Sequence, residues 1–244
     1  MKKIISIIFL FCTLFLPVFL YAQEDLSKAS VELKKLAERY TAPAGLSFEI
    51  EYKYADAEKP GQWLDSLKGK YKIRGKEYWY VLDNTETMGN LDYTIILFKE
   101  DKIMYLSKPS PASMKTNPLS LVDSFIFKKI QKAEIEIGGS QKKISLSFRP
   151  GSIYKKIDYY INVSSGLIDK IVQIVSSDQL YESSVRSLVG PSYAIVEIAF
   201  QHYARNTAED DFFRTDHYFK REGASFLTVT PYESYKIFLG SPDL

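Results

Sequence analysis

The chain is poor in the side chains that usually carry metal, thiol and redox chemistry. It has one cysteine, Cys12, and two histidines, His202 and His217, which lie on different segments. A zinc site normally draws on several closely spaced cysteine, histidine or acidic ligands. Nucleophile-elbow, zincin and phosphate-loop motifs are also absent. The sequence therefore predicts no metal, no cofactor and no catalytic residues, and we expect a protein that is not an enzyme.

The N-terminus has the layout of a secretory signal peptide. Lys2 and Lys3 precede an apolar run, and Ala22 offers a small residue for cleavage before Gln23. The alternative is an uncleaved anchor, although the run is close to the shortest length that spans a bilayer. Cys12 lies inside the run, and the residues before it do not fit a lipidated cysteine. We expect residues 1–22 to be removed, which leaves a periplasmic protein without disulfides or thiol chemistry.

The mature chain has no excess of positive or negative charge. The precursor has 32 Lys and Arg, and removing Lys2 and Lys3 leaves 30 against 30 Asp and Glu. No dense basic stretch remains, so a nucleic-acid partner is not expected. The length fits one β-rich domain over residues 23–244, with residues 220–244 as a candidate C-terminal extension. We expect this domain to be a monomer.

The run Leu67–Leu106 is the most informative part of the sequence. Its first strand-like segment alternates, with lysines and an arginine on one face, whereas the next three are apolar on both faces: Tyr78–Leu82, Thr94–Phe98 and Ile103–Leu106. A strand that is apolar on both faces has no side facing water. Short joints, among them Asp83–Asn90, predict an antiparallel meander. We therefore expect apolar material on each side of this part of the sheet.

The remaining pattern predicts an α+β chain that is mainly antiparallel sheet. Residues 24–40 have the apolar spacing of an amphipathic helix that covers one sheet face. The segment 119–129 is a very apolar short helix, either packed in the core or acting as a lid. Segment 176–190 is loop or short helix, and 228–244 is a weakly patterned tail that could join a sheet edge. Further strands are expected at 46–54, 132–137, 144–149, 157–163, 167–175, 193–201 and 212–219.

Several local phrases, taken in order, resemble the periplasmic outer-membrane lipoprotein carrier (LolA) family. The resemblance covers residues 25–220 and lies in the sequence of elements, since no single motif is specific. The phrases are Lys72–Trp79, where the family has a proline that is absent here, Ile95–Leu106, Pro118–Phe127, Ser145–Pro150 and Tyr160–Ile171.

The resemblance implies an incomplete, half-open β-barrel wrapped around a few helices. Its concave side would be an apolar cavity that receives acyl chains. On this interpretation the cavity residues are Trp79, Ile95, Leu97, Met104, Phe125 and Phe127. Arg74 falls on the arginine that holds the family's lid helix, a role that suits its planar set of donors.

The resemblance also implies a function. The chain would be a non-catalytic carrier or chaperone for outer-membrane sorting. Its partners would be lipoprotein or other lipid acyl chains, with an inner-membrane donor and an outer-membrane acceptor protein. Two alternatives stay open. One is a scaffold subunit of an envelope complex with a filled core, and the other is a hydrolase with an unrecognised site.

Overall fold

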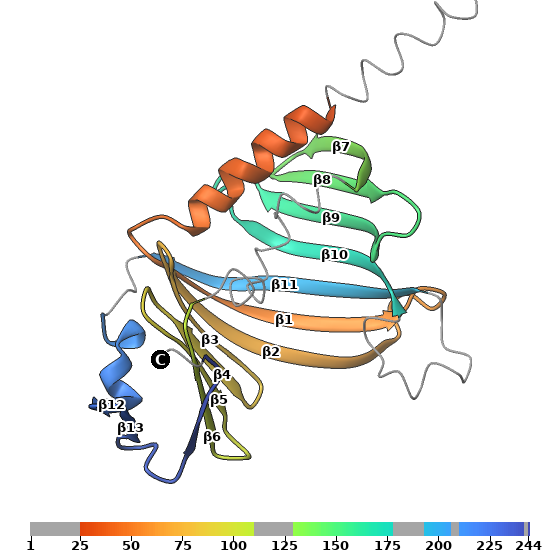
Figure 1. Cartoon of the computed structure of the whole chain (residues 1–244). Helices are drawn as coiled ribbons and strands as arrows, with labels where there is room; N and C mark the ends of the chain where they lie inside the picture. The colour runs from red at the N-terminus through yellow and green to blue at the C-terminus, as the bar shows by residue number, and fades with distance from the viewer. Residues whose placement is uncertain (1–24, 110–128, 178–192, 206–209, 242–243) are drawn as a thin grey trace, which may run out of the picture.

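The computed structural model describes residues 25–109, 129–177, 193–205, 210–241 and 244. Most of these residues form one strongly curved sheet, whose order is β14-β6-β5-β4-β3-β2-β1-β11-β10-β9-β8-β7 (Figure 1). Its strands are β1 (Leu46–Asp56), β2 (Trp63–Arg74), β3 (Glu77–Leu82), β4 (Thr85–Gly89), β5 (Thr94–Phe98), β6 (Ile103–Ser107), β7 (Ile130–Gly138), β8 (Gln141–Phe148), β9 (Tyr154–Asn162), β10 (Ile168–Ser176), β11 (Tyr193–Arg205) and β14 (Lys236–Leu239).

The sheet is antiparallel except at one edge, where β14 pairs with β6 in parallel. The outermost strands, β14 and β7, do not pair with each other, so the sheet does not close. The first strand, β1, lies in the middle and pairs with both β2 and β11. The half-open antiparallel architecture expected from the sequence is confirmed.

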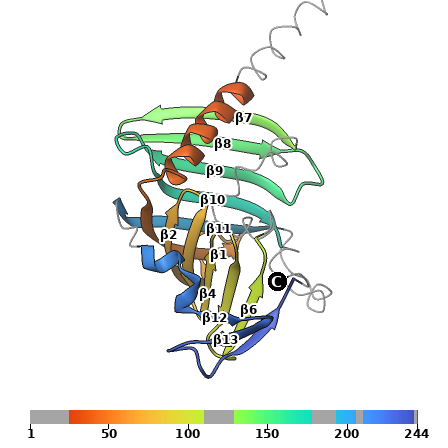
Figure 2. The same cartoon turned by 60° about the vertical axis from the view of Figure 1, so that its left-hand side comes forward.

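One α-helix, residues 25–40, lies along the strand ends of β8 to β11 (Figures 1 and 2). Its apolar side, built on Leu33, Leu36 and Tyr40, is buried, as the helical spacing predicts. Polar contacts fix its position: Arg39 donates to the Ser165 carbonyl at 3.1 Å, and Glu32 pairs with Lys142 on β8. The helix therefore closes one end of the curved sheet.

The inner, concave face of the sheet is apolar and rich in aromatic rings. Side chains of the helix and of strands β1 to β3 and β7 to β11 form one continuous buried cluster there. A row of rings crosses three neighbouring strands: Phe48 stacks on Tyr71 at 5.3 Å between centroids, and Tyr71 stacks on Tyr80 at 4.9 Å. Offset ring pairs of this kind add to the stability that burial itself provides.

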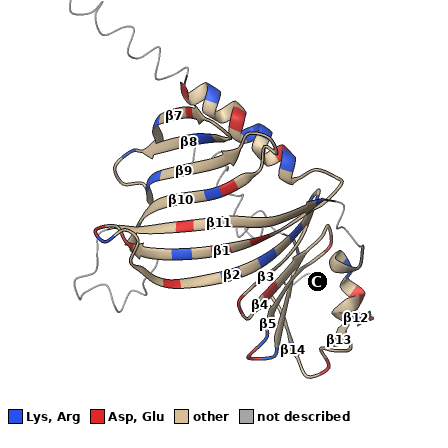
Figure 3. Cartoon of the chain, turned by 180° about the vertical axis from the view of Figure 1, so that it is seen from behind, with Lys and Arg blue, Asp and Glu red and all other residues tan. Residues whose placement is uncertain are grey.

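The outer face of the central strands carries charge of both signs (Figure 3). Lys70 on β2 lies 3.5 Å from Glu49 on β1, and Lys170 on β10 lies 3.3 Å from Glu197 on β11. This face accounts for the alternating pattern of β2, because Lys68 and Lys70 point outward to water while Tyr71 and Ile73 point inward.

The outer face of the meander β3 to β6 is covered by the C-terminal part of the chain. This part contains two 3-10 turns, the hairpin of β12 and β13, and β14 (Figure 1). Together with the meander it buries a second apolar cluster of Met88, Ile95, Leu97, Met104, Leu106, Tyr218 and Phe219. The elements are η4 (Asp210–Phe213), η5 (Thr215–His217), β12 (Phe219–Glu222) and β13 (Ser225–Thr228). This segment is the apolar material on one side of the meander, and β14 is the edge strand expected of the tail.

Two predicted elements are wrong. The expected joint Asp83–Asn90 contains strand β4, whose threonines and Glu86 look polar but are paired or buried in the sheet. The expected strand 212–219 consists instead mainly of 3-10 turns, where Arg214 and Asp216 bond to each other two residues apart. Such local side-chain bonds favour turns over an extended strand. The predicted helix 119–129 and most of segment 176–190 lie outside the described residues. Within the described ranges, no helix is both long and apolar enough to cross a membrane.

Candidate functional site

The inner face has a band of apolar side chains that packing covers only in part. The band runs from β11 across β1 and β2 to the meander, between the end closed by the helix and the tip of the β1–β2 hairpin. Phe98 is 39% exposed and Leu67 is 40% exposed, while the other members are half-buried. The band consists of Val196, Tyr52, Tyr54, Leu67, Leu82, Ile96, Phe98 and Tyr105. This partly exposed apolar band on the concave face of the sheet is called the trough.

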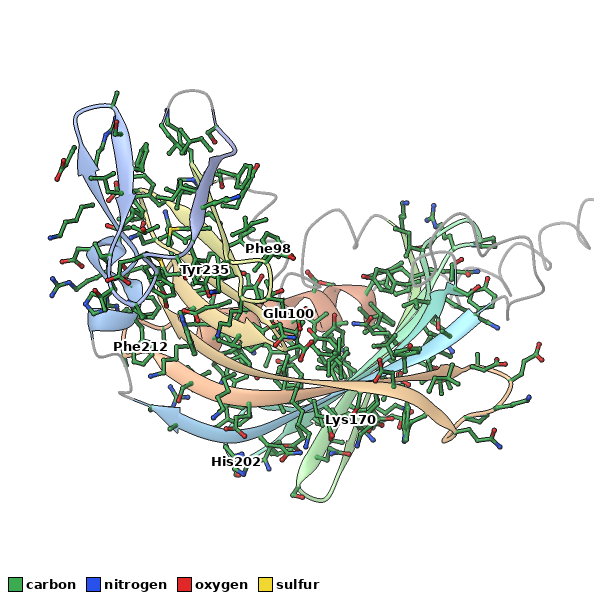
Figure 4. All side chains as sticks on the ribbon, turned by 90° about the horizontal axis from the view of Figure 1, so that it is seen from below. Phe98, Glu100, Lys170, His202, Phe212 and Tyr235 are labelled. Atoms are coloured by element: carbon green, nitrogen blue, oxygen red, sulfur yellow. The ribbon has the colours of Figure 1, made fainter. Side chains whose placement is uncertain are left out.

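Strand register establishes that these residues share one face. Tyr52 is opposite both Leu67 and Ile198, and Ile96 is opposite Tyr105. Directly opposed residues of antiparallel strands point to the same side of the sheet. Figure 4 shows the curvature from below: Phe98 lies toward the inside of the sheet, and Tyr235 lies with the C-terminal segment.

Tyrosine hydroxyls give the trough a polar element without charge. Tyr52 and Tyr71 hydrogen-bond to each other, and burial raises the pKa of Tyr52 to about 12. Burial raises the pKa of Tyr71 as well. Both hydroxyls therefore stay protonated at neutral pH. The buried hydroxyl of Tyr78 on β3 has no hydrogen-bond partner within the described structure. A buried hydroxyl normally has a partner, so a lone one is unusual in a folded protein.

Four of the six sequence-predicted cavity residues are described, and they do not lie on this inner face. Ile95, Leu97 and Met104 are fully buried on the outer side of the meander, where the C-terminal segment packs against them. Trp79 faces the same side and is half-buried against Phe212. Their role as cavity walls stays a prediction, and the side chains that contact them are those of this protein itself.

The other predicted site residues are placed only in part. Phe125 and Phe127 lie outside the described residues. Arg74, at the end of β2, donates from Nε and Nη2 to Glu77 at 2.8 and 2.6 Å. Its guanidinium also lies 4.8 Å from the centroid of the Phe213 ring in η4. The lid-holding role of Arg74 stays a prediction, because the expected lid helix is not described.

Sequence reasoning did not select the inner residues Tyr52, Leu82 and Phe98 as binding residues. Alternation does place Tyr52 on one face of β1 with Phe48 and Ile50, because they recur at every second position, but it does not mark Tyr52 as a binding residue. It could not have shown which face of the meander is covered, because both faces are apolar. Among the described residues, no three His, Cys, Asp or Glu side chains come together as metal ligands.

Comparison with known proteins gives likeness in structure alone. No protein-family model matches the chain, and no curated protein matches its sequence. Among solved structures, a LolA superfamily protein from Nitrosomonas europaea matches with a TM-score of 0.37 and 9% identity, over 77% of this chain and 98% of that one. LprF from Mycobacterium bovis matches with a TM-score of 0.36 and 11% identity, over 72% and 93%. A DUF1329 family protein from Desulfovibrio piger matches with a TM-score of 0.39 and 8% identity, over 79% and 98%.

These likenesses concern general architecture. One of them is to a protein of the superfamily that the sequence resembles. The chain itself has an open, mainly antiparallel sheet. At such TM-scores and identities, these likenesses do not bear on what the chain binds.

Proposed function

We propose that this protein is a non-catalytic carrier or chaperone of the bacterial envelope. It binds the acyl chains of a lipoprotein, or of another lipid, along the apolar trough on the inner face of the sheet. In this role it would accept cargo from an inner-membrane donor and deliver it to an outer-membrane acceptor. The periplasmic location rests on the signal-peptide pattern of residues 1–22.

The observation that supports this function most directly is the partly exposed apolar band. The exposed side chains of Phe98 and Leu67 are on the concave side of an open sheet. Because the sheet is curved, several strands could contact one elongated ligand there. Burying a methylene group contributes about 0.8 kcal/mol, so a long acyl chain can bind firmly with few polar contacts. The trough therefore matches a long, thin, apolar ligand better than a compact polar one.

The tyrosines support a ligand that has a carbonyl group next to its acyl chain. The buried hydroxyl of Tyr78 has no acceptor among the described residues, and an ester or amide carbonyl could accept its proton. Because Tyr52 and Tyr71 stay uncharged at neutral pH, the trough has no fixed charge to repel an apolar chain.

A scaffold role is the second candidate, and one observation favours it. The helix and its neighbours already fill a large part of the inner face, with Leu33, Ile157 and Tyr159 almost fully buried. A protein whose inner face is filled by its own side chains would use the same sheet only as a frame for partners. The two candidates differ in whether lipid is bound.

The deciding experiment is to express the precursor in a Gram-negative host and analyse the purified mature protein by lipid mass spectrometry. We expect an acyl lipid or lipoprotein in near-stoichiometric amount, and saturable binding of a fluorescent C16 fatty acid. Replacing both Leu82 and Phe98 by Glu should weaken that binding by about tenfold or more, because the bound acyl chain would cover two carboxylates and remove them from water. Leu91→Glu is the matched control, since Leu91 is 72% exposed in the β4–β5 turn.

A lipid-free protein that shows no saturable fatty-acid binding would contradict the carrier function and favour the scaffold. Release of free fatty acid from an ester substrate would contradict the non-catalytic part of the proposal.

A further inference from the structure

A second concave site lies on the outer side of the meander, away from the inner trough. It is formed where η5, β12 and the turn after β13 face strands β3 and β4, and it is an open pocket with a volume of about 690 Å³. Cavities of a few hundred to a thousand Å³ are the usual size of small-molecule sites. Among the residues that line the pocket are Trp79, Glu86, Phe212, Tyr218, Lys220 and Tyr232. Phe212 is labelled in Figure 4 beside the outer side of the sheet.

A buried carboxylate forms part of the pocket wall. Glu86 on β4 is 8% exposed, and its Oε1 accepts hydrogen bonds from the indole nitrogen of Trp79 at 2.9 Å and the hydroxyl of Tyr218 at 3.1 Å. Its Oε2 lies 3.0 Å from the ammonium of Lys99. These contacts link β3, β4 and the start of β12 through the carboxylate of Glu86 and hold that carboxylate in one position. The wall is therefore built in advance of any ligand, which lowers the entropy cost of binding.

Aromatic rings from three parts of the chain surround this carboxylate. Trp79 meets Phe212 edge to face at 5.2 Å between centroids, and Tyr218 stacks on Tyr232 at 5.5 Å. Burial, with the nearby Glu86 charge, raises the pKa of Tyr232 to about 12, so its hydroxyl stays a donor at neutral pH. The rings give the pocket flat apolar surfaces with polar edges, which suits a ligand of the same mixed character.

The charges around the pocket are mixed in sign. Asp216 at the mouth pairs with Arg214, while Lys220 lines the pocket. The ammonium of Lys72 already lies over the ring of Phe212, 3.2 Å from its centroid. The Lys72 ammonium would repel a quaternary ammonium ligand at this ring. An acyl chain would cover the carboxylate of Glu86 and remove it further from water, which costs free energy. Both ligand classes are therefore disfavoured.

We propose that this outer pocket binds a saccharide ring of a glycan. A pyranose has an apolar C–H face that can lie on an indole or phenol ring. Its hydroxyl groups both donate and accept, which matches a lining of carboxylate, hydroxyl, imidazole and ammonium groups. The sites for glycan and for acyl chain lie on opposite sides of the sheet, so each can be tested without the other.

Tryptophan fluorescence reports directly on this site. The chain has two tryptophans, and Trp63→Phe leaves Trp79 as the single reporter. We expect at least one of chitotetraose, cellotetraose and maltotetraose to change the Trp79 emission in a saturable way. Tyr232→Ala in the same background should weaken that binding by about tenfold, because one ring surface is lost. Phe238→Ala is the control, since Phe238 is half-exposed on β14 and does not line the pocket.

Circular dichroism melting of each variant separates loss of binding from loss of the fold. A folded Trp63→Phe protein that gives no saturable response to any of the three oligosaccharides would overturn the proposal. So would a response to tetramethylammonium or to a fatty acid in the absence of any response to sugars.

Discussion

At the residue scale, two tyrosines of the inner cluster differ in their polar surroundings. The Tyr40 hydroxyl accepts from the Ile168 backbone N–H at 3.0 Å and hydrogen-bonds to the Tyr203 hydroxyl. Tyr203 in turn donates to the Ile168 carbonyl at 2.7 Å. This small network fastens the last turn of the helix to β10 and β11. The equally buried hydroxyl of Tyr78 has no partner in the described structure.

The two tyrosines therefore predict opposite outcomes for the same substitution. Tyr40→Phe should lower the free energy of unfolding by about 1–3 kcal/mol, because it leaves the Ile168 N–H buried without an acceptor. Tyr78→Phe should change it by less than about 0.5 kcal/mol, since no hydrogen bond within the protein is lost. Urea unfolding followed by circular dichroism measures both. Equal losses in the two variants would mean that Tyr78 has a protein partner after all.

The face of a strand on which each side chain lies was largely predictable from the sequence. What covers that face was not. Alternation correctly separates Tyr71 and Ile73 from Lys70 and Lys72 on β2. It gives no such guidance for Ile95 and its neighbours in the meander, because both faces are apolar. Which face meets the C-terminal segment depends on contacts between residues far apart in the chain, and no local pattern encodes them.

At the element scale, the docking of the helix depends on an ion pair as well as on its apolar side. Hydrogen bonds from Lys142 and then from Lys35 hold the pKa of Glu32 below its usual value of 4.5, against a smaller opposing effect of burial. A carboxylate with a lowered pKa in the folded state stabilises the fold above its unfolded pKa. That contribution is lost as the pH falls through the folded pKa.

We therefore expect Glu32→Gln to be less stable than the unaltered protein at pH 7. The difference should shrink steadily below about pH 4.5, where the unaltered carboxylate becomes protonated. Urea unfolding at pH 7 and pH 3 measures this change. Glu38→Gln, on the exposed side of the same helix, is the matched control and should stay within about 0.5 kcal/mol at both pH values. A Glu32 effect that is the same at both pH values would contradict the ion-pair explanation.

Strongly periodic elements were predictable, whereas elements held by distant contacts were not. The helix and the alternating strands β1, β2 and β8 to β11 stand out from their apolar spacing. Strand β4 was missed, because Thr85, Glu86 and Thr87 read as a polar joint. Glu86 is tolerated there only because Trp79, Tyr218 and Lys99 supply its partners from other segments. Such compensation is visible only once the chain is folded.

At the scale of the whole molecule, the C-terminal segment of the chain shields the apolar outer face of the meander from water. Ending the chain after Arg205 would remove η4 to β14 and uncover Met88, Leu97 and Met104, which are fully buried in the intact protein. We expect the shortened protein to bind the hydrophobic dye ANS strongly and to unfold over a broader range of urea. Leu227→Ser, at a residue 47% exposed on β13, should leave both properties unchanged.

A shortened protein with unchanged dye binding and a sharp transition would mean that the meander is stable without this cover. That result would make residues 206–244 an appendage, as the sequence suggested for the last part of the chain.

The central position of β1 has a consequence for how the protein is made. Although β1 is the first strand of the chain, its partner β11 ends at Arg205, and Leu46 is opposite that residue. The β6 edge receives its parallel partner only when Lys236–Leu239 is present. Pairings between such distant segments form slowly, because a long loop must close first. If residues 1–22 direct export and the N-terminus crosses first, the two halves of the sheet cannot join until most of the chain has crossed the membrane. Until then the apolar strands would be unpaired and exposed next to lipid. We expect the newly exported chain to need a chaperone at this stage, before it can bind a ligand itself.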